Sequence, residues 1–404
     1  MKKITKLMAM LLSLAMLVAV SGCGETKVNQ NVSDDFKVGF IFLHDENSTY
    51  DKNFMDGANK VKEMLNLSDE QVLFKTNVPE GNECYEAAAD LADQGCSVVF
   101  ANSFGHEPYV VKAAKEFTDV QFCHATGTTA HTEKLPNFHN AFASIYEGRF
   151  LAGIAAGMKL NEMIDSGKIT ADQAKMGYVG AFTYAEVISG YTSFYLGAKS
   201  VCPSVTMEVQ FTGSWYDETL EKEAAIKLIS NNCVLISQHA DSMGAPTACE
   251  NAGIPNVSYN GSTKDACPNT FIVSSRIDWA PYFEYMINST VNGEAIVDDW
   301  CKGFDVGAVA LTDINEAAAA EGTKEAIEAA KDKLLKGEIK VFDTKTFTVE
   351  GKELTSYMAD VDTDANYEKD TEVISDGYFH ESEFRSAPYF DINIDGITLL
   401  NSMF

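Results

Sequence analysis

Short apolar runs alternate with longer amphipathic stretches along most of the chain. From residue 37 to residue 123 the pattern predicts strands over 37–42, 71–77, 96–100 and 120–123, with helices over 51–65, up to residue 95 and over 106–117. A second series repeats this order, with strands over 176–179, 205–211, 233–236 and 256–259, and helices that include 187–200 and 217–230. Apolar strands separated by helices are typical of parallel sheets covered on both faces. We therefore expect an α/β protein with two similar, doubly wound parallel-sheet lobes.

The segments between and after the two series define the expected domains. The chain is expected to cross between the lobes just before the helix within 140–158, then over 270–277, which would return it to lobe one, and then over 288–311. The first lobe would comprise 36–140 with 278–311, and the second 141–277. From residue 312 an Ala/Glu/Lys-rich helix is expected to run to Lys336, followed by short alternating segments with a hairpin turn at 350–352. Residues 312–404 would thus form a C-terminal extension that packs on the lobes.

The N-terminal residues combine a short cationic start with an apolar run. The run from Leu7 to Val20 is too short to span a bilayer comfortably, and its position is typical of a secretory signal. It ends in Val20-Ser21-Gly22-Cys23, which resembles the lipobox of bacterial lipoproteins, in which the cysteine thiol receives diacylglycerol. We expect a signal peptide over 1–22, lipidation of Cys23 and a polar tether over 23–35. An ordinary signal peptide with an incidental cysteine is the alternative.

The charge of the chain limits its partners. The formal net charge is −28, and signal-peptide cleavage would remove three lysines and bring it to −31. An acidic surface of this size repels nucleic acid and anionic lipid headgroups. The later sequence holds no run typical of a membrane span. We therefore expect attachment through the lipid alone, at the extracytoplasmic face of the cell membrane.

Eight cysteines accompany the proposed lipidation site. An even number in an exported chain permits disulfides, although a chain of this size does not need them. Cys96 and Cys233 begin apolar strands, so we expect both to be buried as small hydrophobic residues. The sequence has no Cys-x-x-Cys pair, which argues against a structural zinc site. We expect no metal and no cofactor.

Five segments of the chain resemble segments of one known family. Tyr50-Asp51-Lys52-Asn53-Phe54 is similar to its Asp-Lys-x-Phe segment, and Tyr146-Glu147-Gly148-Arg149-Phe150-Leu151-Ala152-Gly153 to its Glu-Gly-x-Phe-Leu-Ala-Gly segment. Phe211-Thr212-Gly213-Ser214-Trp215-Tyr216-Asp217 resembles its Tyr-Thr-Gly-Ser-Phe/Trp-x-Asp segment. Gln238 to Ser242, with Tyr259-Asn260, resembles a branch in which these positions face the ligand. Over roughly residues 36–313 the chain thus resembles the basic membrane protein family of lipoproteins.

The resemblance implies a fold and a function. The fold would be the type I periplasmic-binding-protein fold, in which crossover strands join the two lobes. The protein would be a monomeric solute-binding protein that serves the permease subunits of an ABC importer, with purine nucleosides or nucleobases as the usual ligands. His44-Asp45-Glu46-Asn47 replaces a more Gly-rich opening, and the tail beyond Leu311 is longer and less familiar. These departures concern the ligand more than the fold.

Strand ends indicate where a ligand would bind. In open α/β sheets the ligand lies at the carboxyl ends of the strands. The loops that follow the predicted strands are 43–50, 102–107, 125–129, 182–186, 213–216, 239–244 and 259–262. A purine offers two flat faces and a polar edge, and a ribose offers vicinal hydroxyls. The base would need aromatic side chains, and the sugar would need carboxylates or amides.

Several aromatic residues are candidates to stack on the base. Trp215 follows a strand end, which favours a place in the cleft over a half-buried structural role. Phe42, Phe104 and Trp279 are the candidates for the opposite face, although Phe42 is equally compatible with the core.

Polar candidates come from the same loops. By the family match, Asp51 would accept hydrogen bonds from a ribose, cap the following helix, or do both. Asp241 and Asn260 suit a ribose or a base edge, and His44 and His239 suit ring nitrogens or carbonyls. Each of these four is alternatively a solvated loop residue.

Two other classes of function are weaker alternatives. His44, Asp45, His239 and Asp241 would have to assemble a metal site across the cleft in a hydrolase, but the chain lacks a His-x-x-Glu-His spacing, a Gly-x-Ser-x-Gly elbow and a Gly-rich phosphate loop. The sequence therefore favours a binding protein over an enzyme. A sensor or adhesin with the same fold, or a binding protein for a sugar or signalling molecule, is the second alternative, because one scaffold hosts many specificities.

Overall fold

The computed structural model describes residues 32–361 and 368–403. The predicted signal peptide, Cys23 and most of the predicted tether lie outside the described residues. Within the described residues, no helix has both the length and the apolar character of a membrane span.

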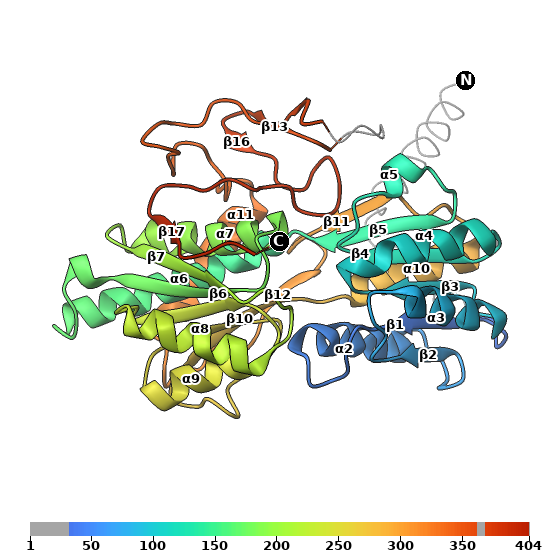
Figure 1. Ribbon diagram of the computed structural model, residues 1–404, viewed down its shortest axis with the longest axis horizontal. Coiled ribbons are helices and arrows are strands. Elements are labelled where there is room, and N and C mark those ends of the chain that lie inside the picture. Colours follow the sequence, from blue (N-terminus) through green and yellow to red (C-terminus); the bar gives the residue numbers. More distant parts are fainter. Residues whose placement is uncertain (1–31, 362–367, 404) are drawn as a thin grey trace, which may run out of the picture. The chain divides into compact units, whose positions relative to one another are not determined.

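The first lobe is built on a six-stranded parallel sheet with strand order β11-β5-β4-β3-β1-β2 (Figure 1). Its strands are β1 (Val38–Ile41), β2 (Val72–Lys75), β3 (Val98–Ala101), β4 (Gln121–Ala125), β5 (Phe138–Ala143) and β11 (Asp299–Lys302). Its helices are α2 (Thr49–Met64), α3 (Asn82–Asp93), α4 (Glu107–Glu116), α5 (Ala130–Glu133) and α10 (Ala280–Asn292), with a 3-10 turn η1 (Phe104–His106).

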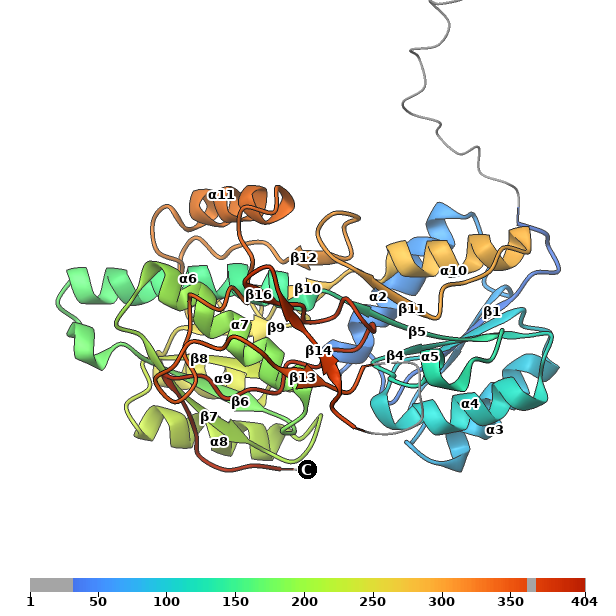
Figure 2. The ribbon, with the colours of Figure 1, turned by 90° about the horizontal axis from the view of Figure 1, so that it is seen from above.

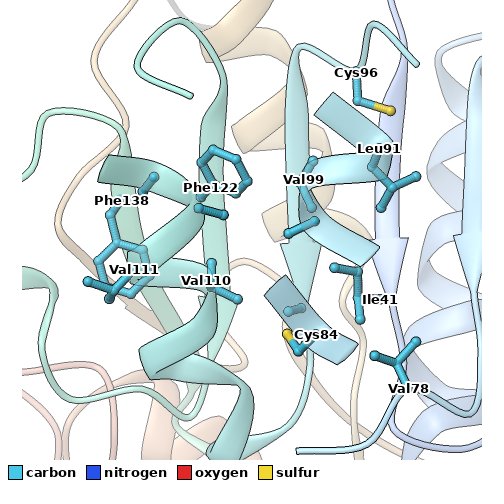
Figure 3. Close-up of a cluster of buried hydrophobic side chains, with 14 of the residues drawn as sticks. Ile41, Val78, Cys84, Leu91, Cys96, Val99, Val110, Val111, Phe122 and Phe138 are labelled. Carbon is cyan, nitrogen blue, oxygen red and sulfur yellow. The ribbon is translucent and has the colours of Figure 1, made fainter. Parts of the chain in front are cut away.

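Side chains that alternate along these strands build a core on each face of the sheet. On one face Phe40 and Phe100 pack against Phe283 of α10, with ring centroids 4.9 Å apart in both pairs. On the other face Ile41 and Val99 belong to a buried cluster with residues of α3 and α4 (Figure 3). Covering both faces requires apolar residues at successive strand positions, which is the pattern that the sequence shows.

The second lobe is built on a seven-stranded sheet with strand order β12-β10-β9-β8-β6-β7-β17. Its strands are β6 (Lys175–Gly180), β7 (Thr206–Phe211), β8 (Leu235–His239), β9 (Asn256–Tyr259), β10 (Phe271–Ile277), β12 (Val309–Leu311) and β17 (Ile397–Leu399). Only β12 runs antiparallel to its neighbour among these described strands. Its helices are α6 (Ile145–Asp165), α7 (Ala185–Val201), α8 (Glu218–Ser230), α9 (Gly244–Ala252) and α11 (Thr323–Leu335), with a 3-10 turn η2 (Ala171–Gln173).

The two lobes share one topology. The order β2-β1-β3-β4-β5 in the first sheet corresponds to β7-β6-β8-β9-β10 in the second. The predicted doubly wound α/β lobes are thus confirmed, and the predicted strands and helices lie within a few residues of the observed ones. Cys96 and Cys233, at the start of corresponding strands, are buried as predicted. All eight cysteines among the described residues are free thiols.

The places where the chain crosses between the sheets differ in part from those expected. It leaves the first sheet after β5 and enters α6. Residues 271–277 form β10, which pairs with β9 in the second sheet, and the chain returns to the first lobe directly after it, in agreement with the expected lobe boundary at residue 277. Residues 309–311 likewise belong to the second sheet rather than to lobe one, because β12 pairs with β10. The second and third crossings therefore lie after β10 and between β11 and β12.

The C-terminal extension lies along the second lobe and contacts both lobes (Figure 2). Helix α11 packs on α6 and begins at Thr323 rather than near residue 312, after Gly322 in a left-handed conformation. The expected turn at 350–352 is present: Val349 and Lys352 exchange backbone hydrogen bonds, and both Glu350 and Gly351 have positive φ. The flanking segments form only this isolated bridge, and the short strands are β13 (Met358–Ala359), β14 (Thr371–Glu372), β15 (Ile374–Ser375) and β16 (Tyr378–Phe379).

One part of the extension joins the two lobes directly. The backbone N and the Oγ of Ser386 donate to Asp299 Oδ1 of β11, at 2.8 and 2.7 Å. The Ser189 hydroxyl of α7 donates to the Glu381 carboxylate. Residues 381–386 therefore link the first sheet to a helix of the second lobe.

Helices α6 and α7 approach each other closely through two glycines. A Cβ atom on Gly153 would lie 2.0 Å from the carbonyl oxygen of Phe194, and one on Gly197 would lie 1.9 Å from the carbonyl oxygen of Phe150. Each glycine faces the backbone of the other helix, so a side chain at either position would force the helices apart. The last glycine of the Phe-Leu-Ala-Gly segment therefore serves packing within the second lobe.

We expect Gly153→Ala to lower the free energy of unfolding by more than about 2 kcal/mol, because its Cβ would overlap a backbone oxygen that cannot turn aside. Urea denaturation followed by circular dichroism measures this change. Glu162→Ala on the exposed part of the same helix is the control and should shift it by less than about 0.5 kcal/mol. Equal stability of Gly153→Ala and the parent would contradict the packing role.

Candidate functional site

A narrow cavity lies between the lobes at the carboxyl ends of their strands. The first lobe contributes residues from the loops after β1, β3 and β4 and from the start of α2, and the second lobe contributes residues at the ends of β7, β8 and β9 and the start of α7. The lining residues are Leu43, His44, Tyr50, Asp51, Ser103, Phe104, Thr126, Glu186, Trp215, His239, Asp241 and Tyr259. The cavity thus lies where ligands bind in open α/β sheets.

The lobes touch each other beside this cavity. The backbone N and the Oγ1 of Thr49 both donate to the carbonyl oxygen of Asp241, at 3.1 Å each. The rings of His44 and Tyr216 lie 5.5 Å apart, and those of Phe104 and Tyr184 lie 5.6 Å apart. The structure therefore has the lobes closed on each other.

Asp51 is fixed at the start of α2. Ser48 caps this helix by accepting from Asp51 N, so Asp51 lies in the first turn rather than at the cap. Its Oδ1 accepts from His44 N at 3.1 Å and from Asn102 Nδ2 at 2.8 Å, and its Oδ2 lies 3.4 Å from His44 Nδ1. Burial acts to raise the pKa of Asp51, but the hydrogen bonds from His44, Asn102 and Ser48 outweigh it and lower the pKa. Asp51 is therefore an ionised acceptor at the cavity wall.

Asp241 lines the cavity from the second lobe, in a different electrostatic environment from that of Asp51. Burial raises the pKa of Asp241 well above its usual range, and the negative charges of Glu221, Asp51 and Glu186 add to this effect. Burial and neighbouring negative charges therefore dominate the environment of Asp241, whereas hydrogen bonds decide the pKa of Asp51.

His239 and Glu186 form a buried pair on the same side. His239 Nε2 lies 3.3 Å from Glu186 Oε1. Burial lowers the pKa of His239 although Glu186 acts to raise it, so the imidazole is neutral at pH 7. The pair adds a second carboxylate from the second lobe to the cavity.

A buried arginine of the second lobe contacts Tyr259, one of the lining residues. The Arg149 guanidinium donates to Tyr178 Oη at 2.7 Å and to Ser237 Oγ at 2.9 Å, and its Cζ lies 5.2 Å from the ring centroid of Tyr259. The Tyr259 hydroxyl is buried and has no hydrogen-bond partner among the described residues. The guanidinium thus packs on the face of the Tyr259 ring, and the hydroxyl stays available to a ligand.

An aromatic cluster forms the second-lobe wall around Trp215. Phe182 and Tyr184 stack at 5.1 Å, and Trp215 packs on Phe182 at 5.1 Å in a T-shaped arrangement. The Trp215 and Tyr184 rings lie 6.1 Å apart. Phe104 of the first lobe packs on Tyr184 and is 43% exposed. Phe104 and Trp215 line the cavity, and Phe182 and Tyr184 pack against them. We call these four rings the aromatic wall.

The structure brings together most but not all of the residues expected at the site. His44, Asp51, Phe104, Trp215, His239 and Asp241 line the cavity. Phe42 instead packs in the core with Phe40 and Phe74. Trp279 stacks on Phe54 at 4.3 Å in the aromatic core of the first lobe. Asn260 is buried with a positive φ after β9 and is not among the lining residues.

Tyr259, which the family resemblance had placed toward the ligand, also lines the cavity. The other lining residues, which were not singled out from the sequence, are Leu43, Tyr50, Ser103, Thr126 and Glu186. All five belong to loops that the strand-end rule had marked, so a signal for them existed. Their residue types alone did not distinguish them from neighbours that point elsewhere. Within the described ranges, no group of three or more His, Cys, Asp and Glu side chains is arranged to hold a metal ion.

Comparison with solved structures shows the type I periplasmic-binding-protein fold. A solute-binding protein of an ABC transporter system from Aeropyrum pernix K1 superposes with a TM-score of 0.64 at 18% sequence identity, over 76% of this chain and 93% of that one.

Two curated proteins are related in sequence. A purine-binding protein of Brucella abortus is 31% identical over 269 residues, which cover 65% of this chain and 71% of the relative. A putative ABC transporter glucose-binding protein of Haloferax volcanii is 28% identical over 256 residues, which cover 63% of this chain and 61% of the relative. Residues 41–345 match the model of the Bmp family, described as PnrA-like ABC transporter substrate-binding proteins. The chain therefore belongs to the Bmp family of ABC transporter substrate-binding proteins.

Proposed function

We propose that this protein captures a purine nucleoside or nucleobase between its two lobes and delivers it to an ABC importer. It acts at the extracytoplasmic face of the cell membrane, held by a lipid on Cys23. The lobes separate to admit the ligand and close around it, because the cavity is narrow and the lobes touch beside it.

The observation that carries the proposal is the pairing of an aromatic wall with carboxylates in one cavity. Asp51, Glu186 and Asp241 converge on it from both lobes, and the described lining residues include no lysine or arginine. Asp51 is ionised and only accepts hydrogen bonds, so the ligand must offer it N–H or O–H donors, whereas Asp241, with its raised pKa, can also donate when it is protonated. A phosphate or carboxylate on the ligand would be repelled. Ribose hydroxyls and the N–H groups of a purine meet these conditions, and the base can lie against the rings.

Sequence relatives support the same class of ligand. The purine-binding relative from Brucella abortus matches across 71% of its own length. The segment around Trp215 resembles a motif of the same family, and this resemblance also implies purines as the usual ligands.

A neutral sugar is the second candidate. The Haloferax volcanii relative is named as a putative glucose-binding protein. A sugar also offers several hydroxyl donors to carboxylates and packs its apolar face on aromatic rings. It differs from a purine in lacking an extended flat ring, so dependence on the aromatic wall distinguishes the two.

We expect inosine, guanosine or adenosine to bind with micromolar or tighter affinity, about −8 kcal/mol or stronger, in isothermal titration calorimetry. Trp215→Ala should weaken this binding by about 1–3 kcal/mol, because it removes a ring from the aromatic wall. Trp215→Phe keeps a ring and should retain most of the affinity. Clear binding of glucose with no binding of any purine would favour the sugar alternative and overturn the purine proposal.

Closure gives a separate prediction about shape. Because a ligand favours the conformation that it binds more tightly, adding a purine should shift the lobes toward the closed state. Small-angle scattering should then show a smaller radius of gyration with ligand than without. An unchanged radius on saturation would mean that the lobes do not open in the free protein.

Asp241→Asn should stabilise the ligand-free protein and weaken purine binding about tenfold. The raised pKa of Asp241 means that its contribution to stability is present below the unfolded pKa, near pH 4, and is lost as the pH rises through the folded pKa. The gain in melting temperature should therefore be larger at pH 7 than at pH 4. Asp56→Asn, at an exposed position of α2, is the control and should change neither property. A lower melting temperature for Asp241→Asn at pH 7 would identify the carboxylate as structural.

Cys23→Ala should abolish lipid attachment, because the thiol is the acceptor in the proposed lipobox. Fractionation of cells should show the variant either released or retained only as the longer, uncleaved precursor. Mutation of a buried cysteine, Cys96→Ala, serves as the control for the loss of a thiol and should leave the fractionation unchanged. A processed, membrane-bound Cys23→Ala protein would disprove the lipid anchor.

A further inference from the structure

The last described residues form part of the ligand-binding lobe. Residues 346–403 follow the segment that matches the family, and within them β17 adds a parallel edge strand beside β7. Ile397, Thr398 and Leu399 pair with Met207, Glu208 and Val209. Gly396 O accepts from Met207 N at 3.0 Å, and Leu400 N donates to Val209 O at 2.9 Å.

Asn401 extends this pairing beyond the end of the strand. Its Oδ1 accepts from Phe211 N at 2.8 Å, and its Nδ2 donates to Phe211 O at 2.9 Å. The amide side chain thus takes the place of a backbone partner for the last residue of β7. Phe211 is followed directly by the loop that carries Trp215.

Met403 contacts two loops of the aromatic wall. Its carbonyl oxygen accepts from Thr183 N at 2.8 Å, and its own N donates to Thr183 Oγ1 at 2.9 Å. Thr183 lies between Phe182 and Tyr184. The Met403 side chain also covers Gly213, since a Cβ atom there would lie 3.5 Å from its Sδ.

The contacts of Asn401 and Met403 do more than cover the edge of the sheet. Pairing of β17 with β7 already covers the edge of the sheet. The bonds from Asn401 and Met403 instead fix the end of β7 and the 182–184 loop, from which the aromatic rings project. Gly213, beside which the Met403 side chain packs, lies in the Trp215 loop, so Met403 contacts both loops.

We propose that residues 396–403, here called the C-terminal clasp, hold the aromatic wall in place for the ligand, with Asn401 and Met403 as positioning residues. This proposal rests on the proposed function, because the wall is assigned there to the ligand. A wall held before binding loses less conformational entropy when the ligand arrives, so affinity rises without a new contact to the ligand. The clasp touches the wall from outside the cavity, because neither residue lines it.

Two changes test the clasp: Asn401→Ala and truncation after Leu400. Each should weaken purine binding about tenfold in calorimetry, because hydrogen bonds that order the wall are lost. Hydrogen exchange should become faster in peptides covering 181–186 and 211–217 of the ligand-free protein. Exchange in the strands of the first lobe should match the parent. Thr398→Ala is the matched control, because this exposed residue lies in β17 itself and its backbone pairing is kept.

The possible results distinguish a failure of the clasp proposal from a failure of the proposed purine-binding function. Unchanged exchange in both wall segments, or unchanged affinity with faster exchange, would overturn the clasp as a positioning device. If truncation also speeds exchange across 206–211, the strand pairing has been lost, and the result of Asn401→Ala decides. If the parent binds no purine, the proposed function fails. In that case Trp215 fluorescence and exchange of the wall in Asn401→Ala still decide whether the clasp orders it.

Discussion

Parallel strands must be covered on both faces, and this constraint shapes the whole molecule. Each lobe meets it with helices on either side of its sheet, as with the Phe40–Phe100–Phe283 contacts on one face of the first sheet and the Ile41–Val99 cluster on the other. Within each series of alternating strands and helices, the helical crossovers bring the strands back in the same direction, so their carboxyl ends lie along one edge of the sheet. The loops at those edges of the two sheets line one cavity.

The cavity contains carboxylates in two electrostatic environments. Donors from His44 and Asn102 stabilise the charge of Asp51, whereas burial and neighbouring carboxylates oppose the charge of Asp241. The charge of Asp241 therefore reduces the stability of the folded protein when this carboxyl is ionised. Arg149, buried behind Tyr259, supplies positive charge without entering the cavity.

The C-terminal extension adds contacts between the two similar lobes. Ser386 bonds to Asp299 of the first lobe, while Glu381 accepts from Ser189 of the second. The same extension then ends in an edge strand of the second sheet and in contacts to the aromatic wall. A segment beyond the family match therefore contacts both lobes and the loop that carries part of the aromatic wall.

The sequence by itself determined the local structure and the approximate place of the site. Apolar runs fixed the strands, their alternation with helices fixed the doubly wound lobes, and the strand-end rule marked the loops that supply the lining residues, with Asp51 one residue beyond. These features follow from hydrophobic periodicity and chain direction, which depend only on residues close together in the sequence.

Only the tertiary structure decided which side chains face the cavity and where distant strands pair. Trp279 and Phe42 are aromatic residues near strand ends, as Trp215 is. Trp279 nevertheless stacks on Phe54, and Phe42 packs beside Phe40, so both are buried in the core of the first lobe. The strands β10, β12 and β17 join the second sheet through long-range hydrogen bonds that leave no local pattern in the sequence. Side-chain direction and strand pairing depend on partners far along the chain, so a local pattern cannot specify them.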